Sequence, residues 1–223
     1  MNPPTLTLYG YWRSSSSYRV RAALELKGLT YRQEAVHLLD DGGHQHREGY
    51  RALNPMRQVP ALVVERDGQR TIVQSVAICE LLEDLFPSPP LLPPDPWARA
   101  QVRALVEVVN SGIQPVANLA VLKYLSRSLG QDEAARNAWI AHWIGLGFEG
   151  LERMLEGSAG RFALGDTPTL ADCFIVPQVY NARRYAVDLA PYPTIARIEE
   201  ACLALPAFQR ASPERQPDAP GAA

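Results

Sequence analysis

The sequence predicts an α/β domain followed by a domain made only of helices. Three observations support this prediction. Short apolar runs of strand type alternate with helical patterns in the first part of the chain. Six prolines then gather within residues 86–96, where no helix interior can form. Beyond them the apolar spacing becomes helical.

The proline-rich stretch sets the expected domain boundaries, because a proline cluster between two different hydrophobic patterns is typical of a linker. The end of the chain is rich in proline, alanine and polar residues, a composition that predicts poor order. We therefore expect an α/β domain at 1–87, a linker at 88–97, a helical domain at 98–211 and a poorly ordered tail at 212–223.

The composition is that of a globular protein with a sizeable core, because 47% of the 223 residues are hydrophobic. The formal net charge is −2 and no basic tract stands out, so we expect no nucleic-acid partner. The sequence shows neither a leader nor an apolar run of membrane-spanning length, so we expect no export and no membrane partner. Three cysteines lie far apart in apolar helical patterns, which fits reduced thiols in a cytoplasmic protein: Cys79, Cys173 and Cys202.

The first strand, at residues 6–9, leads into a serine-rich helix start. Residues 14–17 are four consecutive serines. Serine fits poorly inside a helix but suits its first turn, where a hydroxyl accepts from a backbone N–H that has no helical partner. An apolar helical face follows, and Lys27-Gly28 ends the helix.

This helix start is a candidate anion site. A helix N-terminus offers free N–H donors and about half a positive charge, so it can hold a thiolate or a carboxylate. Three arginines reinforce the positive sign: Arg13, Arg19 and Arg21. The alternative interpretation is a serine-rich turn that only caps the helix.

A second strand is predicted at 31–36, followed by an exposed polar loop that contains His44 and His46. Two histidines suggest a metal site, but at this spacing they would point apart on a strand. No carboxylate–histidine helix motif accompanies them. We therefore expect a solvated loop and no metal.

Pro60 lies directly before an apolar strand at 61–64. A proline in this place is either an edge residue or a cis turn that fixes the backbone. If Val59 is extended beside a cis Pro60, its N–H and C=O are free to pair with a peptide-like ligand.

A hairpin and a helix complete the α/β domain. Asp67-Gly68, between two apolar runs, predicts a tight turn that needs positive φ. Ser75 follows the second strand and lies where it would cap a helix at 76–85. The domain thus has a second helix N-terminus, facing the same way as the first.

Beyond the linker, helical spacing predicts two core-facing stripes. They are Val102, Leu105, Val106, Val109 and Ile113, and then Ile140, Trp143, Gly147, Leu151 and Met154. Thr169 and Asp172 form a variant of the capping box at the start of a later helix. This last motif is a folding feature rather than a chemical one.

The layout and several motifs resemble the zeta class of cytosolic glutathione transferases. The most specific match is the run from Ser14 to Arg21, continued by residues 23–28, which resembles the class signature of serines, Arg-Val-Arg and a Lys-Gly stop. Other matching stretches cover essentially the whole chain: 41–43, 52–56, 58–60, 74–75, 112–115, 118–119, 176–179, 187–189 and 191–193. The resemblance implies a thioredoxin-like N-terminal domain and an all-α C-terminal domain in the glutathione transferase fold, glutathione as the cofactor, and a homodimer.

The resemblance also assigns site residues. In the first domain glutathione would be bound by Ser14, Ser15, Ser16, Ser17, Tyr18, Arg19, Gln45, Val59, Pro60, Gln74 and Ser75. In the second it would be bound by Gln114, Asn118 and Leu119. The catalytic residues would be Ser14, Ser15 and Arg19, with Ser14 the family's thiolate-stabilising hydroxyl. Arg13 and Arg184 would bind substrate, Arg184 meeting a carboxylate.

Two positions depart from the family pattern. Ser16 stands where the family commonly has cysteine, and Ala120 where a serine is usual. Because glutathione brings its own thiol, we expect Ser16 to tune activity rather than abolish it. Ala120 weakens any contact carried by the missing hydroxyl.

The function implied by the resemblance is glutathione-dependent cis–trans isomerisation of a small cis-unsaturated dicarboxylate, of the maleylacetoacetate isomerase type, in aromatic catabolism. A thiolate would add to the double bond, allow rotation and leave again. Three alternatives stay open: maleylpyruvate as the substrate, transferase or dechlorinase activity on α-haloacids, and a module kept only for dimerisation. Intact Ser14, Gln74, Ser75 and Gln114 argue against the last.

Overall fold

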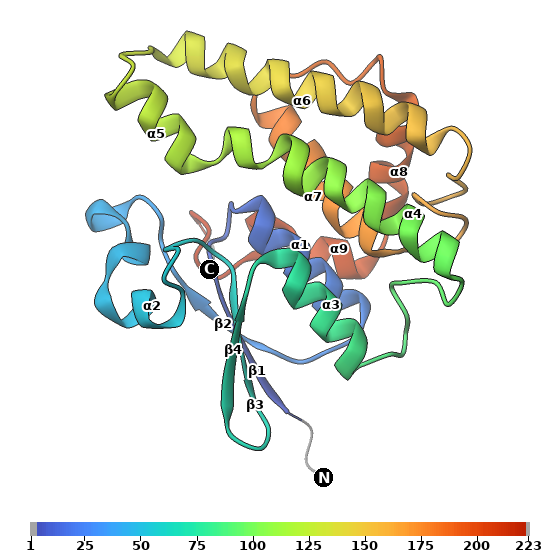
Figure 1. The fold of residues 1–223 in the computed structure, drawn as a ribbon, viewed down its shortest axis with the longest axis horizontal. Helices are drawn as coiled ribbons and strands as arrows, with labels where there is room; N and C mark the ends of the chain where they lie inside the picture. Colours follow the sequence, from blue (N-terminus) through green and yellow to red (C-terminus); the bar gives the residue numbers. More distant parts are fainter. Residues whose placement is uncertain (1–3, 222–223) are drawn as a thin grey trace. The chain divides into compact units, whose positions relative to one another are not determined.

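The computed structural model describes residues 4–221 and divides them into two compact units. One unit contains the chain up to Pro90 together with the segment from Leu205 onward, and the other contains Leu91–Ala204. The first unit is built from strands and helices and the second from helices, as Figure 1 shows. The predicted fold class is confirmed.

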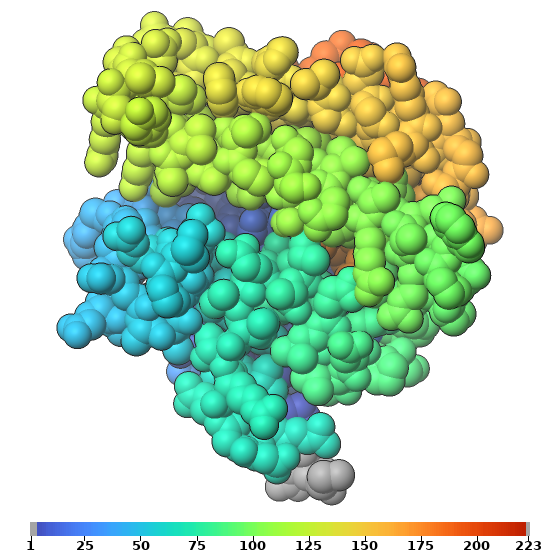
Figure 2. Space-filling model, viewed as in Figure 1, coloured from blue at the N-terminus to red at the C-terminus, as the bar shows by residue number. Residues whose placement is uncertain are grey.

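A four-stranded sheet forms the centre of the first unit. Its order is β2-β1-β3-β4, with β1 parallel to β2 and antiparallel to β3, and β3 antiparallel to β4. Because β4 is an edge strand, its residues are exposed or half-buried, and its segment lies at the surface in Figure 2. The strands are β1 (Thr5–Gly10), β2 (Arg32–Ala35), β3 (Ala61–Glu65) and β4 (Gln69–Val73).

Successive side chains of β1 lie on opposite faces of the sheet. Leu8 is fully buried and lies opposite Leu62, on the face covered by α1 (Ser15–Leu26) and α3 (Ser75–Leu85). Tyr9 points to the other face, where it packs with Tyr50 of α2 (Glu48–Leu53). Figure 1 shows the sheet between these two helical layers. The serine-rich start of α1 therefore follows directly from the end of a central strand.

The boundaries of the first unit differ from the sequence prediction. At the linker, the buried Lys27 ammonium pairs with Glu83 at 2.6 Å and donates to the carbonyls of Phe86 and Pro89 at 2.7 and 3.0 Å. These contacts hold the first linker residues to the end of α1, so the unit extends to Pro90 rather than to residue 87.

The C-terminal segment is the larger correction. The helix α9 (Pro206–Ala211) and the 3₁₀ turn η5 (Pro213–Arg215) belong to the first unit, not to the helical one. The helix α9 packs on α1, where the Tyr18 hydroxyl donates to the Phe208 carbonyl at 3.4 Å. In the tail that was expected to be poorly ordered, Gln216 and Asp218 make defined hydrogen bonds within this unit, and residues 222–223 lie outside the described residues. Composition alone could not show these partners, because they come from the other end of the chain.

The second unit contains the remaining helices. They are α4 (Pro96–Glu107), the π-helical η3 (Val108–Ile113), the 3₁₀ turn η4 (Pro115–Ala117), α5 (Leu119–Arg127), α6 (Glu133–Leu155), α7 (Leu170–Arg184) and α8 (Pro193–Leu203). Every residue of the first predicted stripe, from Val102 to Ile113, is buried. The second stripe is only partly right: Ile140 and Leu151 are buried, but Met154 is 42% exposed. The buried face of α6 instead continues through Ile144, Phe148 and Leu155.

The predicted capping box at the start of α7 is present. The buried Asp172 carboxylate accepts from the N–H groups of Thr169 and Ala163 at 2.7 and 2.9 Å. Burial raises the pKa of Asp172, and these hydrogen bonds act in the opposite direction. The motif therefore organises the core of the helical unit, as expected.

One apolar stretch was not expected. By length and composition alone, Pro96–Arg127 is apolar enough to cross a membrane. This stretch is a succession of α, π and 3₁₀ segments rather than one regular helix; α4 packs on α7, and η3 packs on α6 and α7. Its most buried residues are those of the first stripe, which belong to the core of the helical unit.

Candidate active site

Ser14 occupies the N-cap of α1, at the end of the turn that follows β1. The Ser14 N–H donates to the Tyr11 carbonyl at 3.0 Å, which closes the turn. The Ser14 Oγ accepts from the Ser17 N–H at 3.2 Å. Because a hydroxyl can accept and donate at once, the Ser14 proton remains available to an anion at the helix N-terminus.

The other serines have different surroundings. Ser17 is fully buried, and its Oγ accepts from the Tyr11 N–H at 3.4 Å. Ser15 is 7% exposed, whereas Ser16 is half-buried. Tyr18 is 1% exposed and its hydroxyl bonds to Phe208. The structure thus places Ser17 and Tyr18, two predicted glutathione-binding residues, in the interior, where their side chains pack α1 within the unit.

Arg19 joins the starts of two helices. Its guanidinium is 1% exposed, and Nη1 donates to the Ser75 Oγ at 3.1 Å. Ser75 is the first residue of α3 rather than its cap, because Gln74 takes the cap position with a φ of 74°. A left-handed backbone is uncommon for a residue other than glycine and is enriched at functional sites. Arg19, which we expected to be catalytic, is therefore a buried residue that donates a hydrogen bond to the Ser75 hydroxyl.

The backbone before β3 is held by two side chains. The Gln58 carbonyl accepts from the Tyr50 hydroxyl at 2.5 Å and from Asn54 Nδ2 at 2.7 Å. Burial raises the pKa of Tyr50 to about 12, so this hydroxyl stays protonated and donating at neutral pH. The Val59–Pro60 bond is cis, the second of the two alternatives that the sequence allows. Because the β3 ladder begins at Ala61, the Val59 backbone lies outside it.

Gln45 carries a buried acceptor without a partner. Its side chain lies in the 3₁₀ turn η2 (His44–His46), which follows η1 (Asp40–Gly42). Nε2 donates to the Leu38 carbonyl at 3.3 Å, but Oε1 has no hydrogen-bond partner within residues 4–221. Gly43 makes room for the amide, since a Cβ there would lie 2.4 Å from Nε2. An unsatisfied buried acceptor is costly, so an N–H donor from a ligand would stabilise it.

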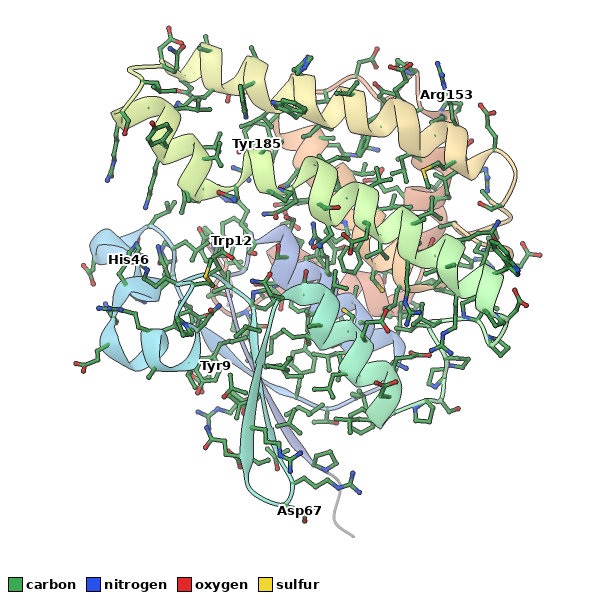
Figure 3. The ribbon with its side chains drawn as sticks, in the orientation of Figure 1. Tyr9, Trp12, His46, Asp67, Arg153 and Tyr185 are labelled. Carbon is green, nitrogen blue, oxygen red and sulfur yellow. The ribbon has the colours of Figure 1, made fainter. Side chains whose placement is uncertain are left out.

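The polar loop that contains His44 and His46 forms the two 3₁₀ turns η1 and η2. His46, labelled in Figure 3, and His44 belong to the segment before α2. In the described part of the chain, no three His, Cys, Asp or Glu side chains gather to hold a metal ion.

Two of the three cysteines have thiols whose pKa is raised by burial. All three are buried, and none forms a disulfide within residues 4–221. Burial raises the pKa of the Cys79 thiol to about 12, and it also raises the pKa of Cys202 strongly. A thiol with such a pKa is almost wholly protonated at neutral pH, so neither Cys79 nor Cys202 offers a reactive thiolate.

In the helical unit, the candidate residues lie at helix ends. Gln114 follows η3, and Asn118 caps α5 by accepting from the Val121 N–H at 3.0 Å. Leu119 begins α5 and is half-buried, and the following Ala120 is exposed. Gly147 of α6 lets this segment pack closely, because a Cβ there would lie 2.2 Å from Ile113.

The two expected substrate-binding arginines each lie beside a neighbouring aromatic ring. The Arg13 guanidinium lies over the Trp12 ring, 5.2 Å from its centre, and that of Arg184 over the Tyr185 ring at 5.0 Å. Arg183, beside Arg184, instead pairs with Glu199. Among the residues described, no carboxylate pairs with Arg13 or Arg184, so both charges can meet an anion.

Known proteins resemble this chain over nearly its whole length. Residues 13–85 match the family model of the glutathione S-transferase N-terminal domain, and residues 137–208 match that of the C-terminal domain. A maleylacetoacetate isomerase from Mus musculus is 50% identical over 213 residues, which are 96% of this chain and 94% of the relative.

Two solved structures share the fold. One is the holo structure of a maleyl pyruvate isomerase, described as a bacterial zeta-class glutathione S-transferase, with a TM-score of 0.91, 47% identity, and coverage of 96% of this chain and 100% of that chain. The other is a maleylacetoacetate isomerase from Anaeromyxobacter dehalogenans with dicarboxyethyl glutathione and citrate in its active site. Its TM-score is 0.88 and its identity 51%, and the match covers 99% of this chain and 100% of that chain. This chain therefore belongs to the glutathione S-transferase family, in its zeta class.

Proposed function

We propose that this chain is a glutathione-dependent cis–trans isomerase of small cis-unsaturated dicarboxylates, with maleylacetoacetate as its preferred substrate. The observation that carries the proposal is the Ser14 hydroxyl, which accepts from Ser17 and keeps its proton for an anion at the N-terminus of α1. The dicarboxyethyl glutathione bound in the Anaeromyxobacter dehalogenans relative joins the same cofactor to a dicarboxylate.

The residues of the first unit fit glutathione, which is a tripeptide with two carboxylates and a thiol. The Val59 backbone, outside the β3 ladder, would pair with the peptide backbone of the cofactor. The N–H groups of α3 and the Ser75 hydroxyl, beside the Arg19 charge, would hold a carboxylate. The partnerless Gln45 Oε1 would accept an N–H. Gln74 completes this set, and Gln114, Asn118 and Leu119 are proposed contacts from the helical unit.

Bound glutathione supplies a thiolate that adds reversibly to the double bond of the substrate and so permits rotation. Ser14 and the N-terminus of α1 favour the ionised thiol, because both interact better with a negative charge than with a neutral group. A free cysteine thiol has a pKa of about 8.5. Lowering it by about two units takes about 2.7 kcal/mol, which one hydrogen bond to a charged acceptor and a helix terminus can provide together.

The substrate carboxylates would be met by Arg13 and Arg184, whose guanidinium groups lie over aromatic rings rather than in ion pairs. The stretch from Gly112 to Lys123 has Gln114 and Ala120 but no additional histidine or arginine. A shorter diacid would need another cation to hold its second carboxylate near the thiolate. We therefore propose maleylacetoacetate rather than maleylpyruvate.

A direct test compares both diacids with the purified protein, with and without glutathione. We expect turnover only with glutathione, and a higher kcat/KM for maleylacetoacetate. A preference of tenfold or more for maleylpyruvate would reverse the substrate assignment, and the resemblance to a maleyl pyruvate isomerase makes this the main competing substrate. Turnover of neither diacid, with α-haloacids accepted, would replace isomerisation by transferase or dechlorinase activity.

We also propose that the chain is a cytoplasmic homodimer. The buried cysteines, which form no disulfide within the described residues, fit a reducing compartment. The dimer rests on the layout that the chain shares with the zeta class. Sedimentation at micromolar concentration should give a dimer, and a monomer alone would contradict this proposal.

A further inference from the structure

The end of the chain contacts the turn that carries Ser14. Asp218 Oδ2 accepts from the Trp12 N–H at 2.9 Å, and Asp218 Oδ1 accepts from Gln33 Nε2 of β2 at 3.3 Å. Figure 3 shows Trp12 beside the start of α1, and in Figure 1 the segment after α9 returns to this end of the helix. One carboxylate therefore joins the C-terminal segment to the β1–α1 turn and to β2.

The carbonyl of Trp12 is held as well. It accepts from Arg21 Nη2 at 3.0 Å, and Arg21 Nε donates to the carbonyl of Ala211, the last residue of α9, at 2.9 Å. Arg21 is fully buried, and its bond to the Ala211 carbonyl forms away from solvent. The Trp12 N–H thus bonds directly to the C-terminal segment, through Asp218. The Trp12 carbonyl is linked to that segment through Arg21, which also bonds to Ala211.

The position of Ser14 depends on this turn. Trp12 is one of the two central residues between the Tyr11 carbonyl and the Ser14 N–H, which bond at 3.0 Å. A shift of the Trp12 peptide would therefore move the Ser14 hydroxyl. Hydrogen bonds to a developing charge lose much of their value when the donor is displaced.

The C-terminal segment is itself fixed. Gln216 is 3% exposed, and its Nε2 donates to the carbonyls of Arg210 and Ser212 at 2.9 and 2.7 Å. These bonds fold the chain back after α9 and place Asp218 two residues further on. Asp218 is therefore presented by an ordered turn, which allows it to hold the Trp12 N–H in one place.

We propose that Asp218 is a positioning residue for the thiolate, which acts through Trp12 to hold Ser14 at the bound sulfur. This inference rests on the proposed function, because it assumes that Ser14 stabilises a glutathione thiolate. A carboxylate suits the task, since its two oxygens accept from Trp12 and Gln33 at the same time.

The test uses the full chain and three variants. Asp218→Ala removes both acceptors, and Asp218→Asn keeps one amide oxygen. Asp67→Ala is the matched control, because it also removes one carboxylate from the first unit but at the tip of the β3–β4 hairpin (Figure 3). The readouts are hydrogen exchange at the Trp12 amide without glutathione, ultraviolet titration of the bound glutathione thiol, and turnover against pH. Thermal unfolding verifies that each variant is folded.

In Asp218→Ala we expect the Trp12 amide to exchange about five- to tenfold faster, because its hydrogen bond is lost. The pKa of the bound thiol should rise by about half a unit to one unit, and turnover near neutral pH should fall about three- to tenfold. The rate should recover at a pH above the raised pKa. Asp218→Asn should restore part of each value, and Asp67→Ala should match the unchanged protein.

Unchanged Trp12 exchange in Asp218→Ala would overturn the proposed hydrogen bond. Faster exchange with an unchanged thiol pKa would show that the turn moves without consequence for Ser14, and would also overturn the proposal. A failure of the proposed function has a different pattern: the unchanged protein itself would show no bound thiolate and no turnover. That result would remove the role assigned to Asp218 even if the exchange data established its bond to Trp12.

Discussion

The two units place their candidate site residues by different means. In the first unit, partners distant in the chain do so: Asp218 holds Trp12, and Arg19 holds the hydroxyl of Ser75. In the helical unit, Asn118 caps its own helix, and the close packing of Gly147 on Ile113 places the segment before Gln114. The first unit, which we propose binds the thiol, therefore depends on hydrogen bonds between distant residues that form only when the whole unit folds. Changes there should alter thiol chemistry, whereas changes in the helical unit should alter stability and substrate binding.

The largest expected effect is that of Ser14→Ala. A hydrogen bond to a charged acceptor is worth about 1.5–3 kcal/mol. Its loss should raise the pKa of the bound thiol by about one to two units and lower turnover about ten- to a hundredfold near neutral pH. Ultraviolet titration of bound glutathione and isomerase rates from about pH 6 to 9 measure both quantities.

Ser14→Ala also removes a helix cap, which costs about 1 kcal/mol. Asp95→Ala is the matched control, since Asp95 Oδ2 caps α4 by accepting from the Ala98 N–H at 2.8 Å. It should lower stability by a similar amount and leave the thiol pKa unchanged. If Ser15→Ala shifted the titration and Ser14→Ala did not, the thiolate-stabilising role would belong to Ser15.

Gly147→Ala tests the helical unit. A Cβ at this position would lie 2.2 Å from Ile113, directly before Gln114, so the helices have to separate. Overpacking of this kind costs about 1–3 kcal/mol. We expect the variant to unfold at a lower denaturant concentration and to bind the diacid more weakly, while the pKa of the bound thiol stays constant.

Gly150→Ala is the control for this change, because nothing lies within 4 Å of a Cβ at that position on the same helix. Alanine favours a helix over glycine by about 1 kcal/mol, so Gly150→Ala should stabilise the protein. A shift of the thiol pKa in Gly147→Ala would contradict the separation of roles between the units.

Much of the fold is predictable because local patterns determine it. The Asp67-Gly68 turn, the end of α1 at Lys27-Gly28 and the capping box at Thr169 each depend on a few neighbouring residues. The helix start at Ser14 is predictable for the same reason. The position of the C-terminal segment cannot be predicted in this way, because Asp218 and Trp12 are 206 positions apart. The composition of a segment describes only its average tendency to be ordered, not its partners.

Burial within the serine run is equally hard to predict. Four identical residues in sequence carry no information on which one faces the core. In the structure, Ser14 and Ser17 differ in how they contact Tyr11. The Tyr11 N–H donates to the Ser17 hydroxyl, and the Tyr11 carbonyl accepts from the Ser14 N–H. Only the packing of α1 on β1 makes Ser17 a core residue and leaves Ser14 at the helix start.

Tyr50→Phe should have a smaller effect, confined to cofactor binding. Loss of the bond to the Gln58 carbonyl should cost about 1 kcal/mol and raise the KM for glutathione about three- to tenfold. Since the pKa of Tyr50 is raised to about 12, the wild-type hydroxyl stays protonated. Its stabilisation is complete below the unfolded tyrosine pKa of about 10 and is lost only as the pH rises through the folded value.

The difference between Tyr50→Phe and the unchanged protein should therefore be constant from about pH 6 to 9. Tyr31→Phe is a suitable control, because burial raises the pKa of Tyr31 to about 12 as well, and its hydroxyl interacts with Glu25 rather than with the segment before β3. It should affect stability but not the KM for glutathione. A pH-dependent difference for Tyr50→Phe would contradict the assignment of its hydroxyl as a permanent donor.

The smallest effect is expected for Ser16→Cys, which restores the residue that the family commonly has. Ser16 is half-buried on the first turn of α1, two residues after the cap, and a thiol there fits in nearly the same volume as the hydroxyl. In the proposed mechanism the reactive thiol comes from glutathione and Ser14 favours its ionisation, so kcat/KM should change less than about threefold, which is under 0.7 kcal/mol. Rates for the maleylacetoacetate and maleylpyruvate substrates, measured together with the thiol titration, decide this. A tenfold gain in rate at an unchanged thiol pKa would show that the side chain at position 16 takes part in the chemistry itself, and that the β1–α1 turn alone does not determine the activity.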